Sequence, residues 1–513
     1  MTKKSTGKTL LLTALFMVAA TMLAKVLGLV RDSMLAASFG AGMEADAFLS
    51  ATKLPTTMFD MVVGGVISAS FIPIFADVYA KKDKTAAMEF ANKFITMILM
   101  ITLLIVIVGI TFAQPLTQFI APGYTGDKLN LTIKLTTIMF PMIIFTGLAF
   151  SFVGILQSMG EFNIPTIISL VSNIAIILYF PLFCDKFGVV GLSVTMVIAW
   201  GLQVLIQIPS LIKFKYKFRL NFKLRDKNVF SALKLAGPML ISTWVQPLCN
   251  LITARLATGT EGAYASLELA NRLYIIVTGV FSFVVTNLIF PKLSKANVSN
   301  QEDEARKLVS VSLKSLLLII LPIMAGFMIL SLPVTSIIYE HGRLNANGVY
   351  LVSNALRFYS IGMLGLAANE VLTKTFFSVK NSKTPMINAI LSMFFNIAVA
   401  YTLFNKIGIV AIALSVSLGS IFNAILNLIC LIRTNSKIFN KNDGLEFVKM
   451  VIATLIMSIV VMLLYRYMYV ADRTMLNQIL ICVICAICGA IAYFITLYIT
   501  KVKLIRELFK KGE

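Results

Sequence analysis

Long apolar runs recur along the whole chain, and this repetition restricts its fold more than any other feature of the sequence. A helix that crosses the hydrocarbon core of a bilayer needs about 20 apolar residues. In lipid, every backbone polar group must be bonded within the protein, which favours helices for such runs. We therefore expect an all-α polytopic membrane protein with about 14 transmembrane helices. The predicted spans are 8–30, 46–76, 91–114, 129–157, 163–184, 188–212, 228–257, 264–291, 308–333, 351–379, 384–404, 408–432, 446–465 and 477–500.

The composition agrees with this fold and excludes other classes of protein. Hydrophobic residues make up 58% of the 513 residues and charged residues only 13%, whereas an ordinary soluble domain is about one-quarter charged. This deficit of charge excludes an ordinary soluble enzyme and a disordered protein. The first apolar run, 8–30, is too long for the core of a signal peptide, so we interpret it as the first span.

The six cysteines predict neither a disulfide framework nor a metal site. All of them lie in or beside apolar runs, unlike the cysteines of small secreted domains. Cys482, Cys485 and Cys488 lie three residues apart on one predicted helix. A zinc site would need a fourth ligand, and the only histidine, His341, is far away in the sequence. We interpret these cysteines as small packing residues and expect no cofactor.

Basic residues are distributed unevenly between the two sides of the predicted spans. An even number of spans places both termini on one side, and that side carries 27 Lys and Arg against six on the other. The positive-inside rule assigns the basic side to the cytoplasm, which predicts an N-in, C-in topology. The basic loop 213–227 is predicted to contact anionic lipid, and we expect no nucleic-acid partner.

A short motif occurs twice, six predicted spans apart. ATKL at 51–54 resembles ANRL at 270–273, and each precedes a proline and a basic loop. Short apolar strings also resemble one another by chance. A genuine repeat would divide the chain into two six-helix halves and a terminal helix pair, at residues 1–220, 221–440 and 441–513. Repeated halves around a central site are typical of transporters.

Charged side chains within the predicted spans are the candidates for function. Even permissive insertion scales assign Arg, Lys or Asp at a helix centre a cost of about 2.5–3.5 kcal/mol, so these residues are expected to face a cavity or a partner. Among the best-placed charges, in or at the ends of the spans, cations outnumber acids by two, and Arg and Lys suit phosphate. We infer a bulky anionic ligand such as a diphosphate, with pairing inside the protein as the alternative. These best-placed cations are Lys25, Arg31, Lys53, Arg255 and Arg272, and the acids counted against them are Asp32, Asp46 and Glu268.

Signatures of catalysis are missing from the sequence. It contains no G-x-x-x-x-G-K-[ST] loop, which excludes an ATP-driven engine of that type. Its single histidine lies in a predicted loop, which disfavours histidine-based acid–base chemistry. A scaffold would not need so many charges within its spans. These points favour a transporter over a membrane enzyme or a scaffold.

Residues 25–55, KVLGLVRDSMLAASFGAGMEADAFLSATKLP, resemble the opening signature of the MurJ (MviN) family of lipid II flippases. The resemblance extends over nearly the whole chain and implies two six-helix lobes in a V around a cationic cavity, with a terminal helix pair beside a groove for the polyprenyl tail. The parent superfamily also contains multidrug exporters of the MATE type. Supporting stretches are ASFIPIF at 69–75, APGY at 121–124, ANRL at 270–273, FPKLSK at 290–295 and KTP at 383–385.

The resemblance also assigns roles to individual residues. Arg31 and Asp32 match the Arg-Asp pair of the family's first helix, and Asp46 matches the aspartate of its second helix. Further matches are Lys25, which replaces an arginine of some members, Lys53 of the KLP motif, and Arg272 of the eighth helix.

The sequence departs from the family pattern at three places. Phe59 and Asp60 stand where many members have an arginine, and Ile275 stands where some have an acid. Some members bind sodium through an aspartate between helices 7 and 11, where this chain offers only the neutral candidates Asn250 and Asn396. Coupling to sodium, to protons or to the membrane potential is therefore left open.

Together these inferences predict a lipid II flippase of the bacterial plasma membrane that works by alternating access. Arg31, Lys53 and Arg272, with Lys25 and Arg255, are predicted to bind the headgroup. Asp32, Asp46 and Glu268 are predicted to support these cations. We expect a monomer whose partners are lipid II and membrane lipids. The alternatives are a flippase for another polyprenyl-diphosphate-linked oligosaccharide and, less favoured, a MATE-type drug exporter.

Overall fold

The structure is a computed structural model whose regular elements are all helices over the residues that it describes. These residues are 3–61, 67, 71–81, 84–223, 230, 244–298, 302–379, 381–434, 441–468 and 474–502. The chain divides into two compact units, Met1–Ala265 and Ser266–Glu513. This division lies at the start of a helix, further along the chain than the predicted boundary after residue 220. The boundary lies there because residues before it, such as Gly262 and Ala265, are bonded to α2 (Met43–Phe59) of the first unit.

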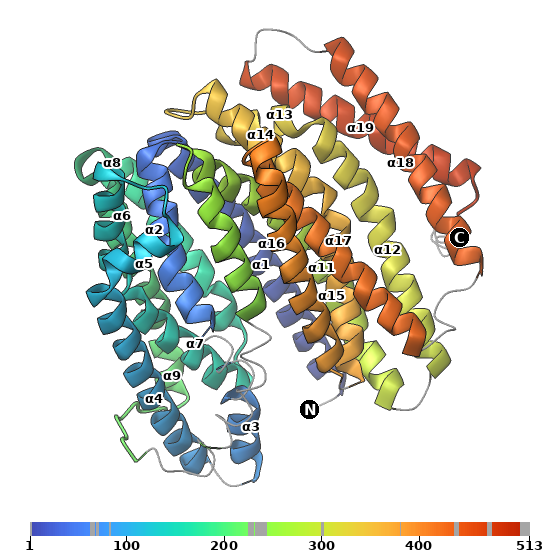
Figure 1. The fold of residues 1–513 in the computed structure, drawn as a ribbon. Coiled ribbons are helices and arrows are strands. Elements are labelled where there is room, and N and C mark those ends of the chain that lie inside the picture. The colour runs from blue at the N-terminus through green and yellow to red at the C-terminus, as the bar shows by residue number, and fades with distance from the viewer. Residues whose placement is uncertain are drawn as a thin grey trace. The chain divides into compact units, whose positions relative to one another are not determined.

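In the first unit, the largest helix interfaces mostly join elements that are distant along the chain, such as α2 and α6 (Figure 1). Its long helices α1 and α8 lie against each other, and α7 packs on both α4 and α8. An unlabelled helix at 244–257 follows the basic loop. The helices are α1 (Lys3–Phe39), α2 (Met43–Phe59), α3 (Ile72–Lys81), α4 (Lys84–Thr111), α5 (Ala113–Ile120), α6 (Gly126–Met139), α7 (Met142–Ser158), α8 (Asn163–Leu205) and α9 (Ile208–Lys213).

The second unit contains the remaining helices and includes the terminal pair. Helix α17 packs against α14, α15 and α16, and α18 packs against α12 and α19. Helix α11 begins just before this unit and continues through its first part. The helices are α11 (Ala263–Val298), α12 (Glu302–Ile329), α13 (Ser331–Tyr339), α14 (Ala346–Ile361), α15 (Met363–Ser378), α16 (Lys383–Ile407), α17 (Val410–Thr434), α18 (Lys441–Met468) and α19 (Met475–Ile499).

Where the structure describes them, the predicted spans lie on helices, which confirms the all-α fold. Parts of two predicted spans, 62–66 and 68–70 of 46–76 and 228–229 and 231–243 of 228–257, lie outside the described residues. Eight helices of the described part are long and apolar enough to cross a membrane, or nine when the bent pair α14 and α15 is taken as one span. This number is lower than fourteen partly because 163–213 counts once. It holds two predicted spans, which are separated by a turn at Gly188 (φ 52°, ψ −148°).

Helix bounds recur along the chain in the order that the repeated motif predicts. Helices α4 and α12 each have 28 residues, and the broken pair α6 and α7 in the first unit is matched by the broken pair α14 and α15 in the second. Gly188 and Gly408 each separate the last two predicted spans of a segment, and both have positive φ, at 52° and 64°. A positive φ is accessible to glycine at little cost. The internal repeat of six-helix segments is therefore supported by the helix bounds of both units.

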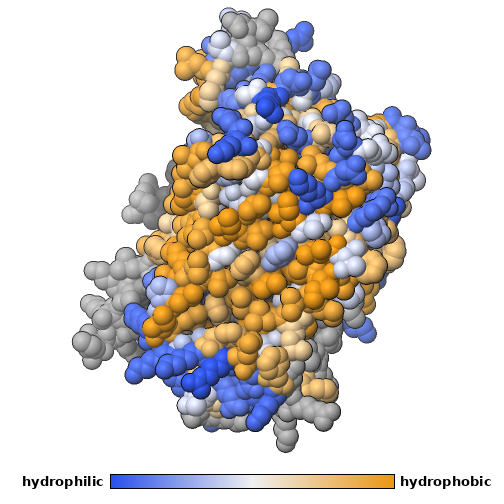
Figure 2. Space-filling model, turned by 90° about the vertical axis from the view of Figure 1, so that its left-hand side faces the viewer, coloured by the Kyte–Doolittle hydropathy of each residue, from blue (hydrophilic) through white to orange (hydrophobic). Residues whose placement is uncertain are grey.

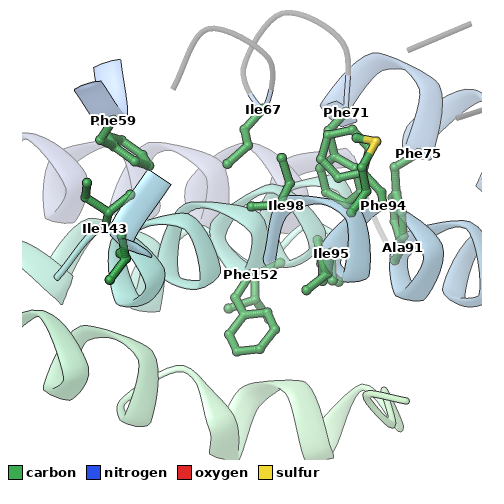
Figure 3. Close-up of a cluster of buried hydrophobic side chains, with 14 of the residues drawn as sticks. Phe59, Ile67, Phe71, Phe75, Ala91, Phe94, Ile95, Ile98, Ile143 and Phe152 are labelled. Carbon is green, nitrogen blue, oxygen red and sulfur yellow. The ribbon is translucent and has the colours of Figure 1, made fainter. Parts of the chain in front are cut away.

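An aromatic cluster forms the core of the first unit (Figure 3). Phe71 is fully buried, and its ring stacks on that of Phe94 with centroids 4.6 Å apart. Phe75 and Phe90 complete this group. Stacked aromatic pairs contribute about 0.5–1.5 kcal/mol beyond the burial of their area. The cluster therefore joins Phe71 and α3 firmly to α4.

The terminal pair α18 and α19 is attached to the second unit by buried and charged contacts. The hydroxyl of Tyr493 in α19 donates to the carbonyl of Leu318 in α12, at 2.9 Å. Lys314 of α12 lies 2.5 Å from Asp443 and 3.1 Å from Glu446 of α18. Ion pairs between neighbouring helices satisfy charges that would otherwise be costly near lipid. They fix α18 against α12.

Large apolar side chains remain exposed on the outer faces of several helices. On the face in Figure 2, hydrophobic residues form a broad band between hydrophilic margins. Leu104 and Ile107 of α4 and Leu182 of α8 are among the exposed residues. Soluble monomers rarely expose a large contiguous apolar surface. It is the surface expected of helices that face lipid tails.

Candidate functional site

Arg31, the first of the predicted cations, is held between α1 and α8. Its guanidinium donates to Oδ1 of Asp32 from Nε at 3.0 Å and from Nη2 at 2.9 Å. Its Nη1 donates to Oδ1 of Asn173 at 3.1 Å. Asp32 thus contacts one of the cations that it is predicted to support. The Arg31 side chain keeps 21% of its surface exposed, so the protein orients its guanidinium without covering it completely.

Asn173 fixes the direction of that guanidinium. Its Nδ2 donates to the carbonyl of Ala24 at 3.1 Å, which leaves Oδ1 to accept from Arg31. The amide therefore bridges two positions of α1 from the buried face of α8. A buried polar side chain with both ends bonded holds one orientation.

Asp46 is fully buried and has three donors, none of which is a predicted site cation. Its Oδ2 accepts from Nζ of Lys128 at 2.6 Å and from the backbone amide of Gly262 at 2.8 Å. Its Oδ1 accepts from the amide of Ala265 at 2.8 Å. A carboxylate at a helix N-terminus is stabilised by free amides and the helix dipole. Asp46 therefore anchors the start of α11 and pairs with Lys128, rather than supporting Arg31 or Lys53.

The loop at 121–125 encloses the Asp46 site. The Tyr124 hydroxyl lies 2.8 Å from that of Ser50 in α2. Burial, with the neighbouring Asp46 carboxylate, raises the pKa of Tyr124, so its phenol stays protonated. The amide of Gly123 donates to Oγ1 of Thr258 at 3.1 Å. The 121–125 loop is thus bonded to α2 through the Tyr124 side chain and to Thr258 through its own backbone.

Arg255, another predicted cation, lies against α5 and near this loop. Its guanidinium carbon is 4.7 Å from the centroid of the Phe119 ring in α5. Cation–π contacts of this kind are worth about 0.5–2 kcal/mol, depending on desolvation. The structure therefore gives Arg255 a local aromatic partner, which places it with α5 and the 121–125 loop.

Lys25 and Lys53 are both half-buried, on α1 and α2 respectively. Lys53 acts electrostatically on Asp60, which follows the end of the same helix. Asp60 is the acid found where many family members are expected to have an arginine. This departure therefore places a counter-charge near Lys53 instead of a second cation.

Arg272 and Glu268 lie one turn apart on α11 and are half-buried. Residues spaced i and i+4 share one face of a helix. The carbonyl of Leu269, next to Glu268, accepts from the buried hydroxyl of Tyr339 at 3.1 Å. Arg272, a predicted cation, and Glu268, a predicted supporting acid, thus share one face of α11.

The two asparagines considered for sodium lie in different units. Oδ1 of Asn250 accepts from Gln246 one turn away, at 3.1 Å. Asn396 of α16 is buried and packs against Gly419 of α17. Within the described ranges, no group of three or more His, Cys, Asp or Glu could hold a metal ion. The sodium assignment stays a prediction.

Two residues of the site are not found by the sequence reasoning. Lys128 counts only as one of the six basic residues in the outer loops, and Asn173 is one polar residue inside an apolar run. The sequence feature that could have identified Asn173 is its side-chain amide within an apolar span, because a polar group in lipid requires a bonding partner. Nothing local marks Lys128 as the partner of a residue 82 positions away.

The chain is similar to one known protein family over most of its length. The profile of the family described as "Lipid II flippase MurJ" matches residues 35–484. A "Probable lipid II flippase MurJ" of Rickettsia prowazekii is 27% identical over 94% of this chain and 96% of its own length. A "Lipid II flippase MurJ" of Burkholderia cenocepacia is 26% identical over 79% of this chain and 80% of its own.

Solved structures agree with these sequence matches. "Lipid II flippase MurJ, inward closed conformation" superimposes with a TM-score of 0.81 and 25% identity, covering 96% of this chain and all of that one. A multidrug resistance MATE family transporter in an inward-facing conformation gives a TM-score of 0.70 at 16% identity, covering 83% of this chain and 98% of its own. The second likeness concerns the fold alone.

Proposed function

The chain belongs to the MurJ family of lipid II flippases, and we propose that it moves lipid II from the inner to the outer leaflet of the bacterial plasma membrane. The cargo is undecaprenyl diphosphate carrying the disaccharide-pentapeptide unit of peptidoglycan. The protein works by alternating access, as a monomer with both termini in the cytoplasm. It therefore supplies precursor for cell-wall synthesis and is a transporter rather than an enzyme.

The observation that carries this proposal is the family match over residues 35–484 together with the state of Arg31 just before it. Arg31 is oriented by Asp32 and Asn173 and keeps an exposed part. An oriented guanidinium can bind phosphate oxygens bidentately. The cations assigned to the diphosphate are Arg31, Lys53 and Arg272.

The same cations suit the physical problem of moving this cargo. The polyprenyl tail stays in lipid, so only the polar headgroup needs a path through the apolar region. Positive side chains replace part of the water that solvates the diphosphate. A diphosphate that crossed such a region without partners would cost several kcal/mol, so contact with these cations lowers the cost of moving the headgroup.

A leaflet-accessibility assay for lipid II tests the function directly. Cells depleted of this protein should accumulate lipid II in the inner leaflet, and the wild-type gene should restore outward movement. Arg31→Gln and Arg272→Ala should abolish this rescue at unchanged protein level, whereas Arg343→Gln, which removes an exposed arginine of a loop, should rescue. Normal rescue by Arg272→Ala would contradict the assigned site.

The coupling force is proposed to include the membrane potential. An empty site with excess positive charge is drawn inward by an inside-negative potential, at about 2.3 kcal/mol per elementary charge and 100 mV. In proteoliposomes, a potassium diffusion potential of that sign should accelerate repeated turnover without sodium or a pH gradient. A rate that follows only sodium or pH would reject this coupling.

A further inference from the structure

The chain that leaves α9 carries a regular alternation of basic and apolar residues. Residues 213–223 read KFKYKFRLNFK, with five basic residues and no acid. They run without helix from residue 216 onward. We call residues 214–223 the basic strap. Its sequence alone predicts contact with anionic lipid, and its structure shows how it is held.

One asparagine of α4 binds the strap as a neighbouring strand would. Asn92 donates from Nδ2 to the carbonyl of Lys217 and accepts on Oδ1 from the amide of Arg219, each at 3.3 Å. Oδ1 also accepts from the hydroxyl of Tyr216 at 2.7 Å. Tyr216 is buried beside Phe152, with ring centroids 6.4 Å apart. Nδ2 and Oδ1 of the buried Asn92 side chain thus both bond to residues 216–219 of the strap.

A second contact sets the direction of the strap along α4. Oγ1 of Thr96, one helical turn after Asn92, accepts from the amide of Asn221 at 3.0 Å. Four helical residues rise about 6 Å, and two extended residues rise about 6.6 Å. Asn92 and Thr96 therefore match the spacing of the amides of Arg219 and Asn221. The strap has a defined register on α4.

This register leaves the charged and apolar side chains of the strap at the surface. Lys215, Lys217 and Arg219 are exposed, and so are Phe218 and Phe222. Glu89, the acid nearest to Asn92 along α4, pairs with Lys93 at 2.8 Å. Across the residues that the structure describes, Lys215, Lys217 and Arg219 form no ion pair with an acid.

We propose that the basic strap is a binding site for anionic phospholipid headgroups at the membrane surface. It follows directly on the membrane-spanning segment Asn163–Lys213, so its exposed rings lie where a bilayer interface begins. Aromatic rings at that level enter the headgroup region, and Lys and Arg bind lipid phosphates there. The occupant is phospholipid, and the inference does not depend on the proposed transport of lipid II.

Titration of the purified full-length protein with dioleoyl-phosphatidylglycerol, followed by native mass spectrometry, tests the proposal. Each basic residue near an anionic surface strengthens binding about fivefold. K215Q/K217Q/R219Q should therefore weaken binding at least tenfold at low salt. K186Q/K406Q/R466Q is the matched control, because it removes two exposed lysines and one exposed arginine elsewhere. The control should stay within twofold of wild type.

A second variant distinguishes lipid binding at an ordered site from general attraction of lipid to the charge of the strap. Asn92→Ala keeps every charge of the strap but removes three of its bonds to α4, and it should weaken phosphatidylglycerol binding several-fold. Binding of dioleoyl-phosphatidylcholine should change in none of the variants. Unchanged phosphatidylglycerol binding in the triple variant, or in Asn92→Ala, would overturn the proposal. An equal loss in the matched control would overturn it as well. Because the assay contains no lipid II, these results are independent of flippase activity.

Discussion

Buried charges in this protein are satisfied one residue at a time by partners distant in the sequence. Asp46 has no exposed side-chain surface and is bonded to Lys128 and to the backbone amides of Gly262 and Ala265, which belong to a much later part of the chain. Removing one member of a buried pair leaves the other charge without compensation, whereas removing both is far less harmful. The residue scale therefore predicts asymmetric effects for single and double substitutions.

Lys128→Met should lower the free energy of unfolding by about 3–5 kcal/mol, because Asp46 stays buried without its cation. The double variant Asp46→Asn, Lys128→Met should recover part of that loss. Equilibrium unfolding in mixed micelles measures both. A double variant less stable than Lys128→Met would show that the ion pair is not what this position requires.

Asn173→Ala should weaken lipid II transport about tenfold or more, since a hydrogen bond to a charged group is worth about 1.5–3 kcal/mol. The loss of its bond to Arg31 leaves the guanidinium oriented by Asp32 alone. Initial rates in proteoliposomes at several lipid II concentrations check this, with the exposed Asn405→Ala as control. A rate defect that persists at saturating lipid II, with unchanged apparent affinity, would speak against a role in positioning Arg31.

At the scale of elements, a bend divides one span of the second unit and α17 supports it. Helices α14 and α15 meet at Gly362 with a change of direction of 44°. The hydroxyl of Ser417 donates to the carbonyl of Phe358 at 2.6 Å, and that of Ser420 to the carbonyl of Gly362 at 3.2 Å. Serine hydroxyls thereby satisfy carbonyls at the break, as helix interruptions in membranes require.

The close packing of α15 on α17 predicts a difference between two glycines. A Cβ at Gly365 would lie 2.6 Å from the backbone nitrogen of Ile421, whereas one at Gly326 in α12 would meet nothing within 4 Å. Gly365→Ala should destabilise the protein by about 1–3 kcal/mol through overpacking. Gly326→Ala should be neutral or stabilising, since alanine favours helix. Thermal unfolding of both variants in detergent decides this, and equal melting temperatures would refute the packing argument.

At the scale of the whole molecule, charge asymmetry and the helical repeat govern how the chain is inserted. The 27 to six distribution of basic residues predicts that both termini are cytoplasmic. Matching helix bounds in α4 and α12, and in α6 and α14, are those of two related six-helix segments. An even number of spans in each segment gives both segments the same orientation.

Reporter fusions test this topology. Green fluorescent protein joined after residue 513 should fluoresce, because that end is predicted to be cytoplasmic. Alkaline phosphatase joined after Lys186, in a predicted outer loop, should be active, and the same enzyme joined after Lys213 should be inactive. Activity after Lys213 with none after Lys186 would reverse the assigned orientation.

The sequence by itself determined the helical class, the spans, the repeat and the family resemblance, and it identified the charged residues within the spans. These properties depend on the length and apolarity of local segments, which bilayer thickness and backbone hydrogen bonding translate directly into helices. Only the tertiary structure decided which partner each charge has: Lys128 for Asp46, Asn173 for Arg31, and Asn92 for the basic strap. Those partners are 82, 142 and 127 residues apart along the chain. Which of them meet depends on how whole helices pack, and no local pattern of residues encodes that.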